Sequence, residues 1–219
     1  AGRTTLAGEG LQHQDGHSLV IAATVPTCIA YDPTFGYELA VIVRSGLKRM
    51  FEDQEDIFYY VMVMNEKYVH PAMPEGVEEG IVKGMYPLHK SKLQTAKQTV
   101  TLFSSGTILR EAQAAATLLE HDFGIAADVW SVTSFNELKR DAEKVARQQC
   151  LSLDYTTKSY LTECLEKMSG PIVAATDYIR AYPEQIRAYV KSTDYHVLGT
   201  DGFGRSDTRE ALRRFFEVD

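Results

Sequence analysis

The sequence predicts an α/β fold in which a mostly parallel sheet is flanked by helices. Short apolar runs, typical of buried strands, alternate along the chain with longer segments of helical periodicity. Turn and capping residues separate the two kinds of segment. Such an alternation is typical of an open parallel sheet covered by helices, and it leaves the order of the strands open.

The chain opens with a polar stretch, 2–18, and continues as a strand–helix–strand series. Residues 28–31 form a brief apolar run, and Pro33 favours a helix that begins after it. Apolar side chains recur at helical spacing over 35–50, which predicts an amphipathic helix of about four turns. Residues 57–64 are apolar without alternation, which predicts a strand buried on both faces.

The middle of the chain predicts a domain boundary. Residues 65–84 are rich in proline, glycine and glutamate, which indicates an irregular segment with a short helix near 75–80. Residues 85–98 are polar and carry three lysines without an apolar face, so they are the predicted linker. The predicted domains are therefore 1–84 and 99–219.

The second domain repeats the strand–helix rhythm. Strands are predicted at 100–103, 129–132, 172–176 and 195–199, and helices at 107–121, 135–145, 155–168, 178–190 and 208–216. Gly124 stands where a helix C-cap is expected. Ser134 with Glu137, and Asp207 with Glu210, form capping-box patterns at the start of two of these helices.

Composition excludes several classes of protein. The formal net charge is -7 and no basic run is present, which argues against nucleic acid as a partner. No apolar run approaches the roughly 20 residues that span a bilayer, so no membrane partner is expected. Three distant cysteines without CxxC spacing indicate a reduced, cytoplasmic chain, with each thiol buried and with no zinc site. The chain opens without Met and directly in a loop, so we expect it to be a fragment of a larger protein.

The opening stretch 2–18 is the first candidate for a functional site. It contains four glycines and two histidines and has no helical or strand period, which predicts an ordered loop. Asp15-Gly16 is a turn dipeptide that would direct His17 away from the backbone. A histidine can hold, donate or accept a proton near neutral pH. The alternative is that His17 only stabilises its own loop. His13 lies four residues earlier, but without a helix this spacing gives no support to a zinc site.

Polar residues at the ends of the predicted strands are further candidates, because function in open α/β sheets lies at the carboxyl ends of strands. Three such ends are 104–106, 176–177 and 200–207. The last is glycine-rich, but it matches neither GxGxxG nor a P-loop. The favoured interpretation is a tight connection whose glycines adopt positive φ and whose Asp207 caps a helix. Residues expected to have only structural or surface roles are Trp130, His70, His89, His121 and His196.

Several motifs together resemble one family. They are GRTTLAGEGLQHQDGHS, YDPTFGYE, PAMPEG, SVTSFNELKRD, ATDYIRAY and LGTDGFGRSDTRE, and they cover nearly all of the chain. They resemble the homodimeric, acetyl-transferring pyruvate dehydrogenase component, a thiamine-diphosphate enzyme of the transketolase-like superfamily. The resemblance implies the latter part of a pyrimidine-binding domain at 1–84 and a transketolase C-terminal-like domain at 99–219, truncated at its end.

The resemblance also implies an activity for the whole enzyme. It is the oxidative decarboxylation of pyruvate with reductive acetylation of lipoyl groups on a dihydrolipoamide acetyltransferase core, in a homodimer of the bacterial cytoplasm. The cofactors implied are thiamine diphosphate and Mg²⁺, both held mainly by residues outside this chain, which alone should be inactive. His17 matches the family's active-site histidine near the substrate, and His13 is a weaker candidate that supports the loop.

Two alternatives remain open at this stage. The chain could come from another thiamine enzyme of the same superfamily that uses a different 2-oxo acid or a ketose donor. It could also be a non-catalytic piece that serves dimerisation and assembly, because the C-terminal domains of the family chiefly support the dimer.

Overall fold

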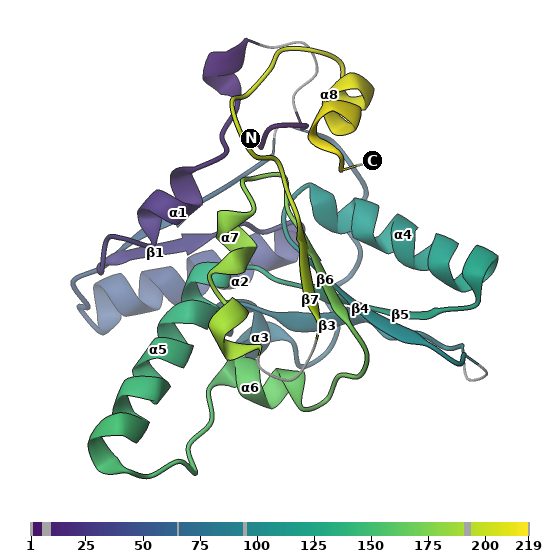
Figure 1. Cartoon of the computed structure of the whole chain (residues 1–219). Helices are drawn as coiled ribbons and strands as arrows, with labels where there is room; N and C mark the ends of the chain where they lie inside the picture. The colour runs from purple at the N-terminus through teal and green to yellow at the C-terminus, as the bar shows by residue number, and fades with distance from the viewer. Residues whose placement is uncertain (1, 6–9, 65, 94–95, 191–193, 219) are drawn as a thin grey trace.

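Two sheets organise the fold (Figure 1). The computed structural model describes residues 2–5, 10–64, 66–93, 96–190 and 194–218. The smaller sheet pairs β1 (Cys28–Tyr31) in parallel with β2 (Phe58–Val61), with Cys28 opposite Phe58. The helix α2 (Gly36–Leu47) connects these strands and continues as a π-helical turn, Lys48–Glu52. This unit confirms the strand–helix–strand series that the first part of the sequence predicts.

The larger sheet has five strands in the order β3-β5-β4-β6-β7. Their bounds are Tyr86–His89 for β3, Thr99–Ser104 for β4, Ala126–Ser131 for β5, Ile172–Ala175 for β6 and Tyr195–Leu198 for β7. Only β3 runs antiparallel to its neighbour, while the other three pairings are parallel. The structure therefore confirms the predicted α/β class with a mostly parallel sheet.

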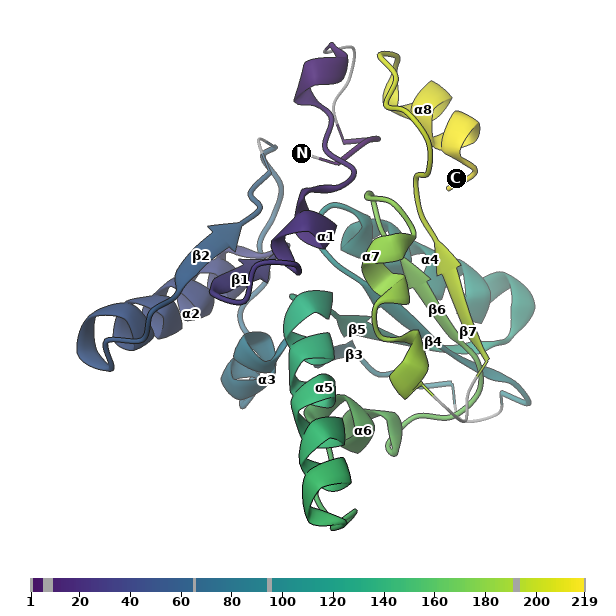
Figure 2. The same cartoon turned by 60° about the vertical axis from the view of Figure 1, so that its left-hand side comes forward.

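Helices cover both faces of the larger sheet. The helices other than α2 are α1 (Ser18–Ala22), α3 (Glu78–Lys83), α4 (Ile108–Phe123), α5 (Phe135–Ser152), α6 (Tyr160–Leu165), α7 (Ala181–Glu184) and α8 (Arg209–Phe216). Neighbouring residues of one strand face opposite cores, as strand geometry requires. Leu102 packs with the side chains of α4, whereas Phe103 packs with those of α5, α6 and α7. In Figure 2, β1, β2 and α2 lie to the left of this sheet.

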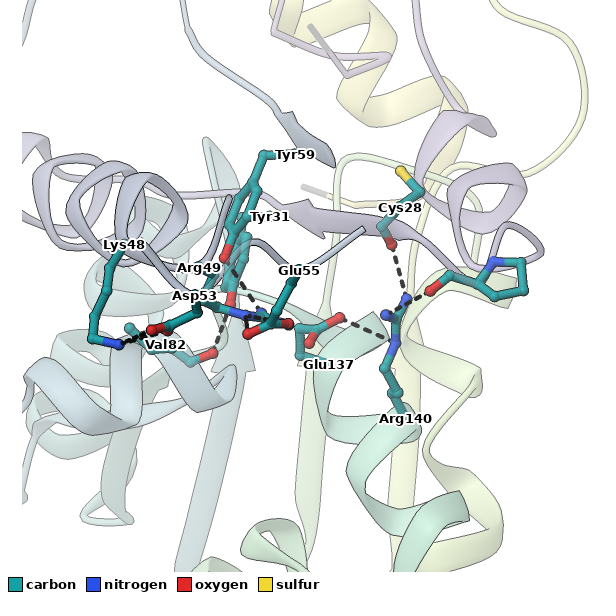
Figure 3. Close-up of polar contacts among 11 residues, drawn as sticks. Cys28, Tyr31, Lys48, Arg49, Asp53, Glu55, Tyr59, Val82, Glu137 and Arg140 are labelled. Carbon is teal, nitrogen blue, oxygen red and sulfur yellow. Dashed lines mark hydrogen bonds and ion pairs between the residues drawn. The ribbon is translucent and has the colours of Figure 1, made fainter. Parts of the chain in front are cut away.

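The start of α5 holds the smaller sheet against the larger one (Figure 3). The Arg140 guanidinium donates to the carbonyl oxygens of Pro26 at 3.0 Å and Cys28 at 2.8 Å. Glu137 lies 3.4 Å from the Arg140 Nε, and burial raises the pKa of its carboxyl group. The Ser134 hydroxyl donates to the Ala30 carbonyl at 2.6 Å. One helix end therefore contacts the backbone of β1 and of the turn before it.

Strand β3 lies within the segment predicted as a linker. Tyr86 is only 1% exposed, and the strand pairs with β5. Pro87 has no N–H to donate, which an edge strand tolerates. The prediction that 85–98 is a linker is therefore wrong for 86–89. The division into domains 1–84 and 99–219 stays a prediction.

Strand β2 is less buried than its composition suggests. Phe58 is 50% exposed and Tyr60 37% exposed, while Tyr59 and Val61 pack against the core under α2. In the part of the chain that the structure describes, α2 covers one face of this strand, so alternate side chains project outward. The prediction of a strand buried on both faces is wrong here.

Three predicted helices begin or end elsewhere. The segment expected at 155–168 is helical only in α6, where the Ser159 hydroxyl caps the first turn by accepting from the Thr162 N–H. The segment expected at 178–190 is divided into α7 and a 3₁₀ turn, Arg187–Tyr189. The short helix expected at 75–80 is α3, a few residues later.

The predicted caps are partly confirmed. Ser134 accepts from the Glu137 N–H at 3.0 Å, and Gly124 closes α4 with φ of 64°. Thr208 caps α8 by accepting from the Ala211 N–H, so the prediction of Asp207 as the cap is wrong. Cys150 is exposed, contrary to the expectation that every cysteine is buried. Among the described residues, none of the helices has the length and apolar character that a membrane crossing requires.

Candidate functional site

The segment 2–5 lies across the carboxyl ends of β6 and β7, next to α8 (Figure 1). Three elements far apart in the sequence meet there, because Asp177 follows β6, Thr200 follows β7 and α8 supplies Arg209. The carboxyl ends of neighbouring parallel strands meet at one edge of a sheet, which is where open α/β sheets place their sites. The arrangement therefore brings the opening loop to the expected edge.

Asp177 anchors this segment. Its carboxylate is 3% exposed and accepts from the Thr4 N–H at 2.8 Å, from the Thr4 hydroxyl at 2.6 Å and from the Thr5 hydroxyl. Burial raises the pKa of the Asp177 carboxyl, although the threonine donors oppose that rise. A Cβ on Gly2 would lie 2.1 Å from the Asp177 Oδ2, so only glycine permits this approach. The contacts bind the start of the loop to the end of β6.

Arg3 points into the space between β7 and the loop. Its side chain is 3% exposed, and its Nη1 donates to the Thr200 carbonyl at 2.7 Å. Its backbone N–H donates to the Asp177 carbonyl at 2.9 Å, and its guanidinium lies 5.8 Å from the centre of the Phe216 ring. Burial lowers the pKa of Arg3, while Asp201, Asp15 and Asp177 oppose this fall. The result is a buried cation at the edge of the site.

His17 stands at the N-cap of α1 with its side chain exposed. Its backbone N–H donates to the Asp15 carboxylate at 3.0 Å, and the Ser18 N–H donates to the same oxygen at 3.0 Å. This contact is the side-chain turn that an aspartate before glycine favours. The His17 Nδ1 lies 3.5 Å from the Arg3 Nη2. The predicted turn is present, and it presents the imidazole beside a buried guanidinium.

His13 lies in the 3₁₀ turn Leu11–His13 and is exposed. Its neighbour Gln14 makes the contacts that connect this turn to the rest of the site. The Gln14 amide donates to the Arg3 carbonyl at 3.0 Å and accepts from the Arg205 N–H at 2.7 Å. The described parts of 2–18 are thus an ordered loop as expected. Residues 6–9 lie outside the described chain, and the role of His13 stays a prediction.

A second buried carboxylate, Asp32, joins the end of β1 to the end of β4. It is 4% exposed and accepts from the Ser105 hydroxyl at 2.7 Å and from the Tyr178 hydroxyl at 3.4 Å. Burial raises the pKa of Asp32 to about 7, and the charges of Asp177 and Glu38 add to the rise. The Ser105 hydrogen bond opposes it. Burial therefore favours the protonated form of Asp32 up to a higher pH than in an ordinary aspartate.

A third buried carboxylate, Glu38, binds α2 to the larger sheet. It accepts from the Phe35 N–H at 2.9 Å, from the Tyr86 hydroxyl at 2.8 Å and from the Ser131 hydroxyl at 2.6 Å. Burial raises the pKa of its carboxyl, and these donors oppose the rise. Every named donor to the carboxylates of Asp32, Asp177 and Glu38 is a neutral N–H or hydroxyl group.

The glycine-rich segment 200–207 is a tight connection beside the loop. Gly202 adopts φ of 82°, and a Cβ on Gly204 would lie 2.5 Å from the Gln14 Oε1. Asp201 pairs with Arg180 at 2.6 Å. Gly202 therefore permits the turn, whereas Gly204 permits the close approach of the Gln14 side chain. The expectation that the glycines of this segment adopt positive φ is confirmed for Gly202.

The remaining candidates have structural or surface positions. Trp130 is buried in the core, and His70 accepts from the Gly36 N–H at 2.9 Å. His121 pairs with Asp122 at 2.7 Å on the surface. Within the described ranges no group of three or more His, Cys, Asp and Glu side chains is placed so that it could hold a metal ion.

Four residues of the site escaped the sequence analysis. In the sequence, Arg3, Thr4 and Thr5 are distinguished only as members of the polar loop, and Asp177 only as a polar residue at a strand end. The available signal was the dipeptide Thr176-Asp177 directly after a predicted strand. Nothing in the sequence paired that strand end with residues more than 170 positions away.

Comparison with known proteins identifies the family. Residues 84–219 match the family model described as transketolase-like TK C-terminal domain. The chain belongs to this transketolase-like family. Residues 1–71 match a second model, the pyruvate dehydrogenase E1 component middle domain. The resemblance drawn from the motifs is therefore confirmed.

Three relatives of this transketolase-like chain are much longer proteins. Proteins named pyruvate dehydrogenase E1 component are 61% identical in Pseudomonas aeruginosa, 51% in Escherichia coli and 50% in Mycobacterium tuberculosis. Each comparison covers 100% of this chain, but only 25%, 24% and 24% of the relative. The chain thus spans about a quarter of the length of these relatives.

Solved structures support the fold. The transketolase of Campylobacter jejuni has a TM-score of 0.67 at 18% identity, over 100% of this chain and 28% of that one. A split gene transketolase, described as an inactive beta4 tetramer, has a TM-score of 0.58 at 17% identity, over 97% of this chain and 60% of that one. At such low identity these structures establish the fold alone.

Proposed function

We propose that the chain is part of a pyruvate dehydrogenase E1 enzyme. In this reaction pyruvate loses carbon dioxide, and the remaining two-carbon unit becomes an acetyl thioester on one sulfur of a lipoyl disulfide, whose other sulfur leaves as a thiol. The observation that carries the proposal is that relatives named pyruvate dehydrogenase E1 component are 50% to 61% identical over the entire chain. Because the chain spans about a quarter of these relatives, we assign the activity to the whole protein and expect the chain alone to be inactive.

The part of the reaction assigned to this chain lies at His17. Its imidazole is exposed at the edge of the sheet and attached to a loop fixed by Asp15 and Asp177. Pyruvate offers a carbonyl and a carboxylate, both of which accept hydrogen bonds. A histidine within reach can orient these oxygens or transfer a proton. We assign His13 a supporting role in the loop, where its neighbour Gln14 contacts the Arg3 carbonyl.

The cofactors of this activity are thiamine diphosphate and Mg²⁺. The resemblance implies that both are bound mainly by residues outside this chain. Thiamine diphosphate supplies the electron sink for loss of carbon dioxide. The dihydrolipoamide acetyltransferase core with its lipoyl domains would be the partner of a homodimer in the bacterial cytoplasm. Light scattering of the full-length protein and co-sedimentation with lipoyl domains test these assignments.

The deciding experiment uses the full-length protein. It is supplied with thiamine diphosphate, Mg²⁺ and an artificial electron acceptor, and turnover is compared for pyruvate, longer 2-oxo acids and phosphoketoses. We expect strong preference for pyruvate. Preference for another donor would move the assignment to a different thiamine enzyme, and no activity with any donor would contradict the enzymatic proposal.

The role of His17 has its own test. We expect His17→Ala to lower turnover of pyruvate by roughly 10²- to 10⁴-fold, the range typical of a lost proton-transfer group. Cofactor affinity, measured by titration of the apoenzyme, should stay nearly unchanged because the ligands lie elsewhere. His121→Ala is the matched control, since this exposed histidine lies on α4 away from the loop. Equal turnover of His17→Ala and wild type contradicts the role.

Assembly is the second candidate function. One observation favours it: Phe58 and Tyr60 of β2 are 50% and 37% exposed, which leaves an apolar surface that another subunit would cover. In this case the chain would supply contacts between subunits and no reacting group. Analytical ultracentrifugation of the 219-residue chain distinguishes the cases, because a stable dimer or tetramer supports the assembly role and a monomer contradicts it.

A further inference from the structure

We propose that Arg209 of α8 is a positioning residue that ties the opening loop 2–18 to the segment after β2 and so fixes the place of this loop at the active site. This inference rests on the proposed function, in which the opening loop lies at the active site. It does not depend on which histidine of the loop contacts the substrate. It assigns a task to a helix that the proposed reaction does not otherwise use.

The first observation is the contact between Arg209 and the loop. The Arg209 Nε donates to the Thr5 carbonyl at 2.6 Å. Thr5 is only 4% exposed, and its hydroxyl donates to the Asp177 carboxylate and lies 3.1 Å from the Thr107 hydroxyl. A buried carbonyl that loses its donor costs the free energy of an unmade hydrogen bond. Without Arg209, we therefore expect the backbone at Thr5 to move until its carbonyl finds another donor.

The second observation is a forked ion pair on the other side of the guanidinium. The Arg209 Nη1 and Nη2 each lie 3.2 Å from an oxygen of Glu66, in the segment after β2. Two such N–H···O bonds fix the direction of a guanidinium as well as its position. All three nitrogen atoms of Arg209 thus donate within the chain, so the side chain joins two segments of the protein. We call Arg209, Thr5 and Glu66 the α8 clamp.

The third observation is that Glu66 is itself held in place. The Arg110 Nη1 lies 3.4 Å from the Glu66 Oε1, and the Arg110 guanidinium lies 4.6 Å from the centre of the Tyr68 ring. Burial raises the pKa of the Glu66 carboxyl, but the hydrogen bonds and charges of Arg209 and Arg110 outweigh burial, so this pKa lies below its ordinary value. Glu66 therefore stays ionised at neutral pH, and α4 fixes the counter-charge of the fork.

The fourth observation concerns the orientation of α8. Thr208 caps the helix directly before Arg209, and the side chains of Leu212 and Phe216 are buried. Arg214 lies on the exposed side of the same helix, where it pairs with Glu210 at 3.1 Å. The helix therefore directs Arg209 towards the loop and Arg214 towards solvent, which makes Arg214 the matched control.

The consequence is that two elements hold the start of the loop from different sides. The Asp177 carboxylate, at the end of β6, accepts from the Thr4 N–H, whereas Arg209 of α8 donates to the Thr5 carbonyl. A displacement of about 1 Å at an active site can lower the rate on the order of 10²-fold. Loss of Arg209 is therefore expected to lower turnover although no reacting group is removed.

Hydrogen exchange tests the α8 clamp in the absence of any reaction. Exchange of the full-length protein is followed by mass spectrometry in the wild type, in Arg209→Met and in Arg214→Met. We expect faster exchange at 2–5 and 10–16 in Arg209→Met, and the wild-type rate in Arg214→Met. Wild-type exchange of the loop in Arg209→Met overturns the inference, as does equal acceleration in Arg214→Met.

Kinetics of the full-length enzyme test positioning against substrate binding. We expect Arg209→Met to lower kcat with pyruvate by roughly 10- to 100-fold, in the range of a misplaced group. KM should change less than about twofold, because Arg209 donates within the chain. Arg209→Lys should retain more activity than Arg209→Met, since an ammonium still donates but cannot form the fork. A loss confined to KM, or equal activity of the Lys and Met variants, overturns the inference.

A double-mutant cycle tests whether Glu66 acts through Arg209. Glu66→Gln keeps the shape of the side chain but removes its charge, so it should lower kcat less than Arg209→Met does. In the Arg209→Met background, Glu66→Gln should change kcat less than about twofold, because no guanidinium remains to be held. Glu55→Gln is the matched control, since Glu55 forms a similar forked pair with Arg49 away from the loop. Full additivity of the two losses, or an equal loss in Glu55→Gln, overturns the inference.

The failures are distinguishable. If the full-length wild type does not turn over pyruvate, the proposed function fails, and hydrogen exchange still decides whether Arg209 holds the loop. If the wild type is active and Arg209→Met retains its full turnover, the proposed function stands and the inference fails. If Arg209→Met also speeds exchange throughout α8, Glu66→Gln decides, because it leaves that helix unchanged: faster exchange of the loop supports the inference, and wild-type exchange overturns it.

Discussion

Asp32→Asn should remove a pH dependence of stability that the wild type carries. The Asp32 carboxyl has a pKa of about 7 in the folded chain, whereas its ordinary value is 3.8. The folded state therefore binds the proton more tightly than the unfolded state. Protonated Asp32 is favoured at low pH, and stability falls as the pH rises from about 4 towards 7. Asparagine has no such titration and can still accept from the Ser105 hydroxyl.

The magnitude follows from the two pKa values of Asp32. One unit of difference corresponds to about 1.4 kcal/mol, and the difference accumulates between pH 4 and pH 7. From pH 4.5 to 6.5 the wild type should lose about 2–3 kcal/mol of unfolding free energy relative to Asp32→Asn. Above pH 7.5 the difference between the two proteins should become constant. Asp177 and Glu38 are present in both proteins, so the difference between the two proteins reports the Asp32 carboxyl together with its coupling to these two charges.

Urea unfolding followed by tryptophan fluorescence measures this difference. Trp130 is the single tryptophan of the sequence and lies in the buried part of β5. The free energy of unfolding is determined at half-unit steps from pH 4.5 to 7.5 for both proteins. Asp56→Asn is the matched control, because Asp56 is exposed and should give a curve parallel to that of the wild type.

Two outcomes would refute the reasoning. Parallel curves for wild type and Asp32→Asn would mean that Asp32 titrates alike in the folded and unfolded states. A relative loss of wild-type stability with falling pH would mean that the carboxylate is stabilised, and then its neutral donors would outweigh its burial.

Two further predictions concern the ends of helices. Gly84→Ala should lower the free energy of unfolding by more than about 2 kcal/mol, because φ is 110° and the new Cβ would lie 2.6 Å from the Ser134 carbonyl. Gly124→Ala is the control, since open space surrounds this glycine, and it should lower the free energy of unfolding by only about 1 kcal/mol in the same urea assay. Thr208→Ala should lower the free energy of unfolding by about 1 kcal/mol and speed hydrogen exchange in α8, because the helix loses its N-cap. Asp207→Ala should change that exchange much less. Equal effects of the two variants would contradict Thr208 as the cap.

The sequence predicted the elements whose signals are local. The helix α4, its C-cap Gly124 and the Ser134 cap of α5 depend on contacts within a few residues, and all are present. Strand β3 escaped prediction because Tyr86-Pro87-Leu88-His89 contains proline and does not alternate cleanly. Its pairing partner β5 lies about 40 residues later, and the tolerance for Pro87 depends on an edge position that only the tertiary fold provides.

The helix predicted at 178–190 shows how one residue changes a periodic pattern. The spacing of apolar side chains continues through this segment, but the Pro183 ring would clash with a helical carbonyl four residues earlier. Pro183 therefore has to lie in the first turn, and α7 begins only at Ala181. Tyr182 and Ile186 are still buried in the core. The periodicity of apolar residues therefore predicted the burial of these side chains correctly, but it did not predict that the helical backbone is interrupted.

The candidate site was predictable in part. His17 could be singled out because residue type and the Asp15-Gly16 turn are local features. The pairing of Arg3 with Thr200 and that of Thr4 with Asp177 bridge 197 and 173 residues, and no periodicity carries information over such distances. Burial of Arg3 and Asp177 is equally a property of the assembled fold, since isolated charged residues are normally assigned to the surface.

The contacts between the opening loop and the last helix have a consequence for synthesis of the protein. Residues 2–18 leave the ribosome before residues 200–216, and at 5–20 residues per second roughly 10–40 seconds separate the two segments. During that time Arg3 has neither the Thr200 carbonyl nor the Phe216 ring, and the Thr5 carbonyl lacks Arg209. The environment of His17 is therefore completed only after α8 has been made, later than the loop itself. A ribosome that stops before α8 releases a chain in which the opening loop lacks its contacts with Thr200, Arg209 and Phe216.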